Sequence, residues 1–352
     1  MPVRTSRGGI ATVTKRVSNP PNPWLSTSVE WLEEPPDAPL EIYEERAKSI
    51  LTRNESPDVP FRFGLNPYRG CQHACAYCYA RPSHEYLSLG AGTDFDRKLI
   101  VKTNAPELLR RELGRQGWQG DAIVLSGNTD CYQPLEASYG LTRRCLEVAR
   151  DFENPVTVIT KAALVRRDAE LLAELHERAH AEVFISCAFA DDSLARAIEP
   201  SVSAPSRRFE AIRALHDAGV PVSVFFAPLI PGLNEDQISP VLERAQEAGA
   251  RSASMTLLRL PGATREVFFQ RLESELPLRA KRVRNALADM RSRQSRPSDF
   301  GTRMRGTGER WKAAARLFEV QCKRLGLRTN AEDPQRWTVP RRPRPTQRSL
   351  FS

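Results

Sequence analysis

The sequence predicts an α/β fold, a partial (β/α)6 TIM-like barrel with an N-terminal arm and a basic helical C-terminal extension. Three observations predict this architecture. Short β-branched, apolar runs alternate with amphipathic stretches, which is the order of strand and helix in a parallel sheet. The strand-like runs are almost continuously apolar, as strands covered on both faces should be. Several helix-like stretches end at Gly or run into Pro, as in DAGVP at residues 217–221.

The elements of the barrel follow from this alternation. Strands are expected at residues 61–67, 122–128, 156–161, 182–189, 222–228 and 252–258. Helices are expected at residues 107–116, 141–152, 169–180, 206–219 and 240–249. Right-handed crossovers would make all these strands parallel. In such a barrel the chemistry takes place at the carboxyl ends of the strands, so polar residues that end a strand are candidates for a site.

Four segments are expected along the 352 residues. Residues 1–55 are rich in Pro, Ser and charge and form a partly disordered arm, with one helix-like run at residues 41–51. Residues 56–260 form the core barrel. Residues 261–330 form the basic extension, with a helix over 309–325 whose Trp311 and Phe318 face inward. Residues 331–352 are a Pro/Arg-rich tail that we expect to be disordered.

The formal charge of +9 is unevenly distributed. Residues 259–352 hold 23 Lys and Arg against 9 Asp and Glu, a net charge of +14, so the remainder of the chain is slightly acidic. A basic segment attracts phosphates, which makes nucleic acid a candidate partner of the C-terminal region. A solvated, Arg-rich surface is the alternative.

The chain has no segment that predicts a membrane or a secretory destination. A transmembrane helix needs roughly 20 apolar residues, and the apolar runs here are short and strand-like. The N-terminal residues 1–20 lack the apolar region of a secretory signal. We therefore expect a cytoplasmic protein with no membrane partner.

Three of the seven cysteines, Cys71, Cys75 and Cys78, stand together in the stretch RGCQHACAYCYA. In a reducing compartment such a cluster is typical of metal binding or catalysis rather than of disulfides. A structural zinc site usually closes with four ligands, and His73 inside the loop does not complete a familiar set. A redox pair needs only two thiols. A compact loop of three thiolates can instead hold an iron–sulfur cluster in which one iron stays open.

The spacing of these cysteines, with Tyr77 before the last one, resembles the C-x3-C-x-aromatic-C signature of the radical S-adenosylmethionine (SAM) superfamily. The resemblance implies a [4Fe–4S] cluster on Cys71, Cys75 and Cys78, whose fourth iron chelates the amino and carboxylate groups of SAM. It implies that one-electron reduction cleaves SAM to a 5′-deoxyadenosyl radical, which abstracts hydrogen from a substrate that the sequence does not identify. An electron donor such as a flavodoxin or a ferredoxin would be the partner. Tyr77 would lie near the adenine edge.

Polar residues that end the later strands are the candidates for holding SAM. Ser126, Thr129 and Asp130 follow the second strand and replace the Gly-Gly-Glu turn that often holds the amino group of SAM in this superfamily. A carboxylate and hydroxyls are suitable acceptors for an ammonium. An ordinary turn or helix cap is the alternative for Asp130. Lys161 ends the third strand, where it would meet the carboxylate of SAM, and Ser186 ends the fourth, near the expected ribose.

The order of several motifs is similar to that of the spore photoproduct lyase group of radical SAM proteins, over residues 61–260. The motifs are the cysteine loop, Thr-Asp at 129–130, Thr-Lys at 160–161, Ile-Ser at 185–186, Glu-Pro at 199–200, the Arg-rich helix at 207–213 and Ala-Pro at 227–228. The lyase reverses a thymine–thymine lesion in DNA, so a nucleic-acid lesion lyase or repair enzyme is one alternative function.

One departure separates this chain from the lyase itself. The lyase has a cysteine just before its Ser-Asp turn that returns a hydrogen atom to the product, and here Gly127 and Asn128 fill that region. We therefore expect a relative of the lyase rather than the lyase. Cys131 and Tyr132 remain candidate catalytic hydrogen donors, with packing of a loop as the alternative. A non-catalytic iron–sulfur redox sensor is a further alternative, and SAM binding would discriminate it.

Two other features have simpler explanations. Residues 176–180 read HERAH, a literal H-E-x-x-H, the pattern that presents two zinc ligands on one helical face. No third ligand follows, and the far end of this helix faces away from the active side of a barrel, so we expect a solvated face. Cys145, Cys187 and Cys322 stand in apolar contexts and are expected to pack in the core.

Overall fold

The fold is centred on a large, mainly parallel sheet. The computed structural model describes residues 39–59, 61–290 and 304–329, so residues 1–38 of the expected arm and the expected tail at 331–352 lie outside the described part. The strands of this sheet are β2 (Leu51–Arg53), β3 (Phe63–Leu65), β6 (Ile123–Leu125), β7 (Val156–Thr160), β8 (Ala181–Ser186), β9 (Val222–Leu229), β10 (Ser252–Leu257) and β11 (Arg328–Thr329).

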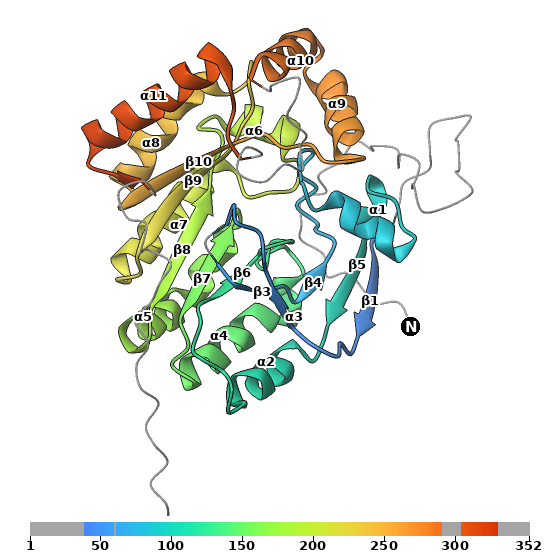
Figure 1. Ribbon diagram of the computed structural model, residues 1–352, viewed down its shortest axis with the longest axis vertical. Helices are drawn as coiled ribbons and strands as arrows, with labels where there is room; N and C mark the ends of the chain where they lie inside the picture. The colour runs from blue at the N-terminus through green and yellow to red at the C-terminus, as the bar shows by residue number, and fades with distance from the viewer. Residues whose placement is uncertain (1–38, 60, 291–303, 330–352) are drawn as a thin grey trace, which may run out of the picture.

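The sheet runs in the order β11-β10-β9-β8-β7-β6-β3-β2, and it curves through the middle of the molecule (Figure 1). All neighbours from β3 to β11 pair in parallel, and only β2 at the edge is antiparallel to its partner. The expected α/β class with a parallel sheet is confirmed. Parallel pairing brings the carboxyl ends of these strands to one edge, which is where the candidate site residues must meet.

Helices connect the strands. They are η1 (Arg81–Leu87), α1 (Thr93–Arg97), α2 (Ala105–Gly114), α3 (Glu136–Tyr139), α4 (Leu141–Asp151), η2 (Ala163–Asp168), α5 (Ala169–Arg178), α6 (Asp192–Ile198), α7 (Pro205–Asp217), η3 (Glu235–Gln237), α8 (Ile238–Glu247), α9 (Thr264–Glu275), α10 (Pro277–Met290) and α11 (Gly308–Leu325). The apolar faces of α2, α4, α5, α7, α8 and α11 join one continuous core with the sheet.

The C-terminal extension packs in two places. Trp311 and Phe318 of α11 contact the main core, as expected. Helix α9 instead packs behind the cysteine loop, where Phe268 and Leu272 share a second core with Cys75 and Tyr77. The extension therefore supports the loop that carries the three thiols.

A second, three-stranded sheet lies beside the first and corrects one expectation. Its strands are β1 (Glu41–Glu45), β5 (Lys98–Lys102) and β4 (Tyr68–Arg69), in the order β1-β5-β4. The prediction of a helix within residues 41–51 was wrong, because residues 41–45 are a strand paired in parallel with β5. Its partner is more than 50 residues away in the chain, so no local pattern indicates the pairing.

The HERAH motif does not form a metal-binding face. Helix α5 ends at Arg178, and His180 has a φ of 146°, outside helical geometry. His176 Nδ1 lies 2.9 Å from the carbonyl oxygen of Ala181, so this ring is occupied by the backbone. Cys145, Cys187 and Cys322 are buried in the main core, as expected. In the part of the chain that the structure describes, no helix combines the length and apolarity needed to cross a membrane.

Candidate active site

A cavity of about 760 Å³ opens at the carboxyl ends of the parallel strands. Nine predicted residues line it, namely Cys71, Cys75, Tyr77, Cys78, Ser126, Thr129, Asp130, Lys161 and Ser186. They come from the loop after β3 and β4 and from the ends of β6, β7 and β8. The topology therefore gathers all the predicted metal and cofactor residues in one place, although they span more than 100 positions of the chain.

The cysteine loop is held mainly by backbone contacts and by one arginine that sequence reasoning missed. Arg81 is almost fully buried, and its guanidinium donates to the carbonyl oxygen of Cys75 from two nitrogens, at 3.1 and 3.0 Å. It also pairs with Asp96 at 2.9 Å. Gly70, just before the first cysteine, has a φ of +75°, and a Cβ there would lie 2.6 Å from Leu99 Cδ2. Both the conformation and the space require Gly.

The three thiols do not have the environment of nucleophiles. Burial raises the pKa of each, and the carboxylates of Asp130 and Glu199 add to the effect at Cys71 and Cys75 respectively. A nucleophilic or redox cysteine needs a lowered pKa, so these thiols lack that preparation. A bound metal displaces the proton and stabilises the thiolate directly, so the donor set fits a metal group.

The donor set also fits a cluster in particular. Among the described residues, no group of three or more His, Cys, Asp or Glu side chains surrounds a single metal-ion position. Three cysteines from one loop, all lining one cavity, are a donor set that can hold an iron–sulfur cluster.

Asp130 joins three segments at the cavity wall. One carboxylate oxygen, Oδ1, accepts from Thr160 Oγ1 at 2.7 Å and from the Tyr132 backbone N–H at 2.9 Å. The other, Oδ2, accepts from the Lys161 backbone N–H at 2.8 Å and lies 3.3 Å from His73 Nδ1. Burial favours the neutral acid, but His73 and these hydrogen bonds outweigh it and lower the pKa of Asp130 to about 2. The residue is therefore ionised.

Tyr77 is held by a buried ion pair. Its hydroxyl donates to Glu199, and the same carboxylate pairs with Arg208 of α7. Arg208 also donates to the carbonyl oxygens of Ser203 at 2.7 Å and Ser186 at 3.1 Å. The Glu-Pro motif and the Arg-rich helix therefore have a structural role. The sequence identified both motifs but did not indicate what they do.

The other predicted cofactor residues differ in how free their side chains are. Lys161 Nζ lies 5.7 Å from the centre of the Tyr77 ring, at the cavity wall. Thr129 Oγ1 donates to the Tyr68 carbonyl oxygen at 2.9 Å, and Ser126 Oγ accepts from the Cys131 backbone N–H at 2.7 Å. Thr129 and Ser126 thus already serve the turn that follows β6.

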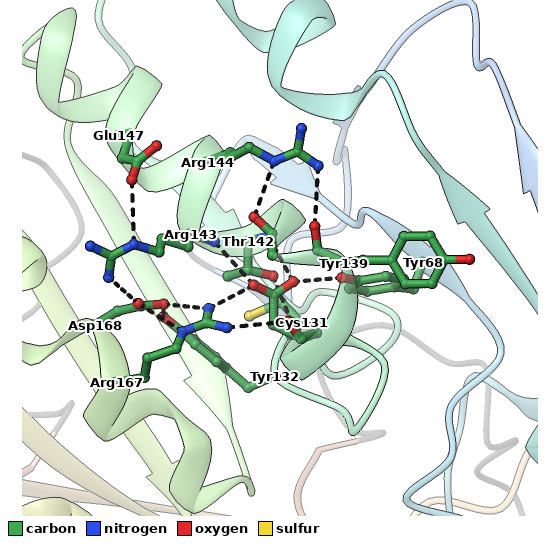
Figure 2. A network of polar contacts seen from close by, with 12 residues as sticks. Tyr68, Cys131, Tyr132, Tyr139, Thr142, Arg143, Arg144, Glu147, Arg167 and Asp168 are labelled. Carbon is green, nitrogen blue, oxygen red and sulfur yellow. Dashed lines mark hydrogen bonds and ion pairs between the residues drawn. The ribbon is translucent and has the colours of Figure 1, made fainter. Parts of the chain in front are cut away.

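Cys131 and Tyr132, for which the sequence left open a donor role or packing of the loop, are not among the residues that line the cavity. Both side chains are fully buried in the main core. Figure 2 shows Tyr132 directed toward Asp168, to which its hydroxyl donates at 3.0 Å. The chain turns at Asp130, so the next two side chains point behind the strand ends instead of into the opening. The donor role has no geometric support, whereas the alternative of loop packing fits.

Comparisons with known proteins agree with the site. The family model of the radical SAM superfamily matches residues 65–245, just over half of the chain. An uncharacterized protein of Mycobacterium tuberculosis, Rv2578c, is 38% identical over 234 residues, which are 65% of this chain and 68% of that protein. An uncharacterized protein of Methanocaldococcus jannaschii, MJ0683, is 29% identical over 194 residues, covering 55% of this chain and 70% of that protein.

A solved structure shares the fold. Spore photoproduct lyase complexed with dinucleoside spore photoproduct superposes with a TM-score of 0.59 at 13% identity, covering 82% of this chain and 81% of that chain. The matched family model includes the cysteine loop and the ends of β6, β7 and β8. The chain therefore belongs to the radical SAM superfamily, whose enzymes use a [4Fe–4S] cluster and S-adenosylmethionine.

Proposed function

We propose that this chain is an enzyme that cleaves SAM reductively and abstracts hydrogen from a substrate held in the cavity. The observation that carries the proposal is the meeting of three cysteine thiols, two buried and one half-buried, with strand-end polar residues on one cavity wall. When bound, the cluster and SAM supply the one-electron cleavage and the 5′-deoxyadenosyl radical, while the protein supplies orientation and excludes water. We also infer that β3 and β6 to β10 form the six-unit partial barrel of this family.

Each residue has a distinct task in this proposal. Cys71, Cys75 and Cys78 would hold the cluster to which SAM binds. Lys161 offers an ammonium to the carboxylate of SAM, and Ser186 lies at the end of the neighbouring strand to meet the ribose. Tyr77, fixed by Glu199, presents its backbone and ring edge to the adenine.

Asp130 acts indirectly in this scheme. A carboxylate offers about four acceptor positions, and here four donors occupy them. The ammonium of SAM would have to displace one of these donors. Asp130 therefore positions Lys161 and the cysteine loop, and Thr129 is similarly committed to Tyr68.

The test is anaerobic reconstitution with iron and sulfide, followed by addition of SAM and dithionite and detection of 5′-deoxyadenosine by mass spectrometry. The Cys75→Ala variant should lose the product. The matched control is Cys145→Ala, which removes a buried thiol far from the cavity and should keep it. If the cluster assembles but SAM neither binds nor breaks, the proposal fails and a redox sensor takes its place.

The reductant in the cell would be a flavodoxin or a ferredoxin, for which dithionite substitutes in the test. This part of the proposal rests on family chemistry alone. Reduction of the reconstituted cluster by a purified flavodoxin or ferredoxin, followed by its optical spectrum, would support it. Absence of reduction by either protein class would exclude both.

A nucleic-acid lesion is the second candidate substrate. The net charge of +14 over residues 259–352 favours it, because a basic segment binds phosphates by releasing counterions. The experiment compares DNA binding across salt concentrations for the full chain and for a variant lacking residues 330–352. The last described strand ends at Thr329, so this truncation leaves the described fold intact. Absence of binding at low salt would exclude this candidate.

A further inference from the structure

The small sheet presents two cations to the cavity. Arg69 of β4 pairs opposite Ile100 of β5, and Lys102 is two residues farther along β5. Residues two apart on a strand share a face, so Arg69 and Lys102 are diagonal neighbours, roughly 7–8 Å apart at Cα. Both line the cavity and both are half-buried. The other face of β5 carries Leu99 and Val101 into a local core, which fixes this orientation.

Neither cation forms an ion pair with an acidic side chain among the described residues. Within the described residues, the side chain of Arg69 makes no hydrogen bond or ion pair, and Lys102 Nζ donates only to the carbonyl oxygen of Asn66 at 3.1 Å. Arg53 on the same cavity wall, in contrast, lies 3.6 Å from Glu55. Burial, reinforced by the nearby Arg69, lowers the pKa of Lys102 and outweighs the opposite effect of Glu45, its register partner on β1. Two like charges are therefore kept close together at a cavity wall, and among the described residues neither side chain forms an ion pair with a carboxylate.

We propose that Arg69 and Lys102 bind a phosphate monoester group of the substrate. The inference rests on the proposed function, since it assumes that the cavity holds a substrate. A phosphate monoester carries nearly two negative charges at neutral pH and three acceptor oxygens, so it can neutralise both cations at once. A carboxylate or a phosphodiester brings only one charge. The planar Arg fork suits two oxygens of such a group, and Lys adds a point charge.

The pair lies apart from the residues assigned to SAM. Lys161 and Ser186 lie at the ends of β7 and β8, whereas β4 and β5 lie beyond β3, on the side away from β7 and β8 (Figure 1). SAM has a single carboxylate, for which Lys161 is already placed. A phosphate held by Arg69 and Lys102 would anchor the substrate across the cavity from the cofactor, with its carbon framework between them.

The test measures binding directly. Glycerol 2-phosphate is titrated calorimetrically into the reconstituted protein, with and without SAM. The variants are Arg69→Gln and Lys102→Gln, and the controls are Arg316→Gln and Lys312→Gln on the exposed face of α11. Each cavity variant should weaken phosphate binding by about tenfold or more, because a charge-assisted hydrogen bond is lost. Lys102→Arg should retain binding, and SAM affinity should not change in any of these variants.

Four results would overturn the proposal. The first is that the unmodified protein does not bind glycerol 2-phosphate, and the second is that it binds inorganic phosphate but not the phosphate ester. The third is that acetate or a dinucleoside phosphodiester binds as tightly as glycerol 2-phosphate. The fourth is that the cavity variants lose SAM affinity in parallel with phosphate affinity. The last would assign the pair to SAM. The titration without SAM distinguishes failure of this proposal from failure of the proposed function. Phosphate binding can be measured even if the protein does not cleave SAM.

Discussion

At the scale of single residues, Asp130 shows how one carboxylate organises the site. It receives donors from the cysteine loop, from its own turn and from the end of β7, so it ties three segments that the cofactor must touch together. The sequence indicated its place but not its partners. A turn carboxylate before a buried strand end is visible locally, whereas the contact with His73 joins residues 57 positions apart. Only the closed fold determines that contact.

Replacing Asp130 with Asn should destabilise the protein in a pH-dependent way. The folded pKa of about 2 is below the ordinary 3.8, so the carboxylate stabilises the native state by about 2 kcal/mol at neutral pH. Because the folded pKa is the lower one, this stabilisation is present above the unfolded pKa and disappears as the pH falls toward 2. Urea unfolding across this pH range should show that the difference in unfolding free energy between the unmodified protein and Asp130→Asn decreases toward zero.

The control for that experiment is Asp151→Asn. Asp151 pairs with Arg110 at 2.8 Å, but the side chains of Arg110 and Asp151 are 54% and 36% exposed. Surface pairs contribute roughly 0–1 kcal/mol, so this variant should lose little stability. A gap for Asp130→Asn that stays constant from neutral to acidic pH would contradict the assigned ionisation.

At the scale of elements, predictability followed the range of the interactions. The strands of the barrel were predicted because each is an apolar run that local patterning reveals. Strand β1 was not, since EIYEE is mostly exposed and becomes a strand only through pairing with β5. The same holds for the site, where the cysteines and the strand ends could be predicted. The ion pair of Glu199 and Arg208, which we call the brace, connects α7 to Tyr77 of the cysteine loop. Tyr77 and Glu199 are 122 residues apart in the chain, so no local sequence pattern predicts their contact.

This brace gives a second prediction. Glu199→Gln should cost about 3–5 kcal/mol of unfolding free energy, because it leaves the Arg208 charge buried without its partner. Tyr77→Phe should cost less, roughly 1–3 kcal/mol, since only one hydrogen bond is lost. The double variant Glu199→Gln, Arg208→Met should recover much of the loss, because no buried charge remains. Chemical denaturation of all three would check this order, and a double variant as unstable as Glu199→Gln would refute it.

At the scale of the whole molecule, the residues of the candidate site and the residues of the main core lie in different parts of the fold. The site residues gather at one edge of the sheet, while most helices pack along its outer face in a continuous core. Parallel topology explains why strand-end residues could be predicted to meet without any knowledge of distances. It also explains why Cys131 and Tyr132 could not be placed from sequence. Cys131 directly follows Asp130 of the cavity wall, yet its side chain is in the core. The conformation of the turn determines whether such a side chain faces the cavity or the core.

This separation predicts that the core under α11 can be weakened without loss of cofactor binding. Phe318 is buried between α11 and the main core, so Phe318→Ala should cost about 3–5 kcal/mol through lost burial and the resulting cavity. Leu317, its half-exposed neighbour on the same helix, should cost much less when replaced by Ala. Denaturation gives the two stabilities, and equilibrium dialysis at low temperature gives SAM affinity. SAM affinity should stay within about twofold of the unmodified protein for both variants, since apolar burial in α11 contributes to ΔG of unfolding rather than to the cavity wall. A SAM affinity that fell in step with the stability of Phe318→Ala would mean that α11 shapes the site itself.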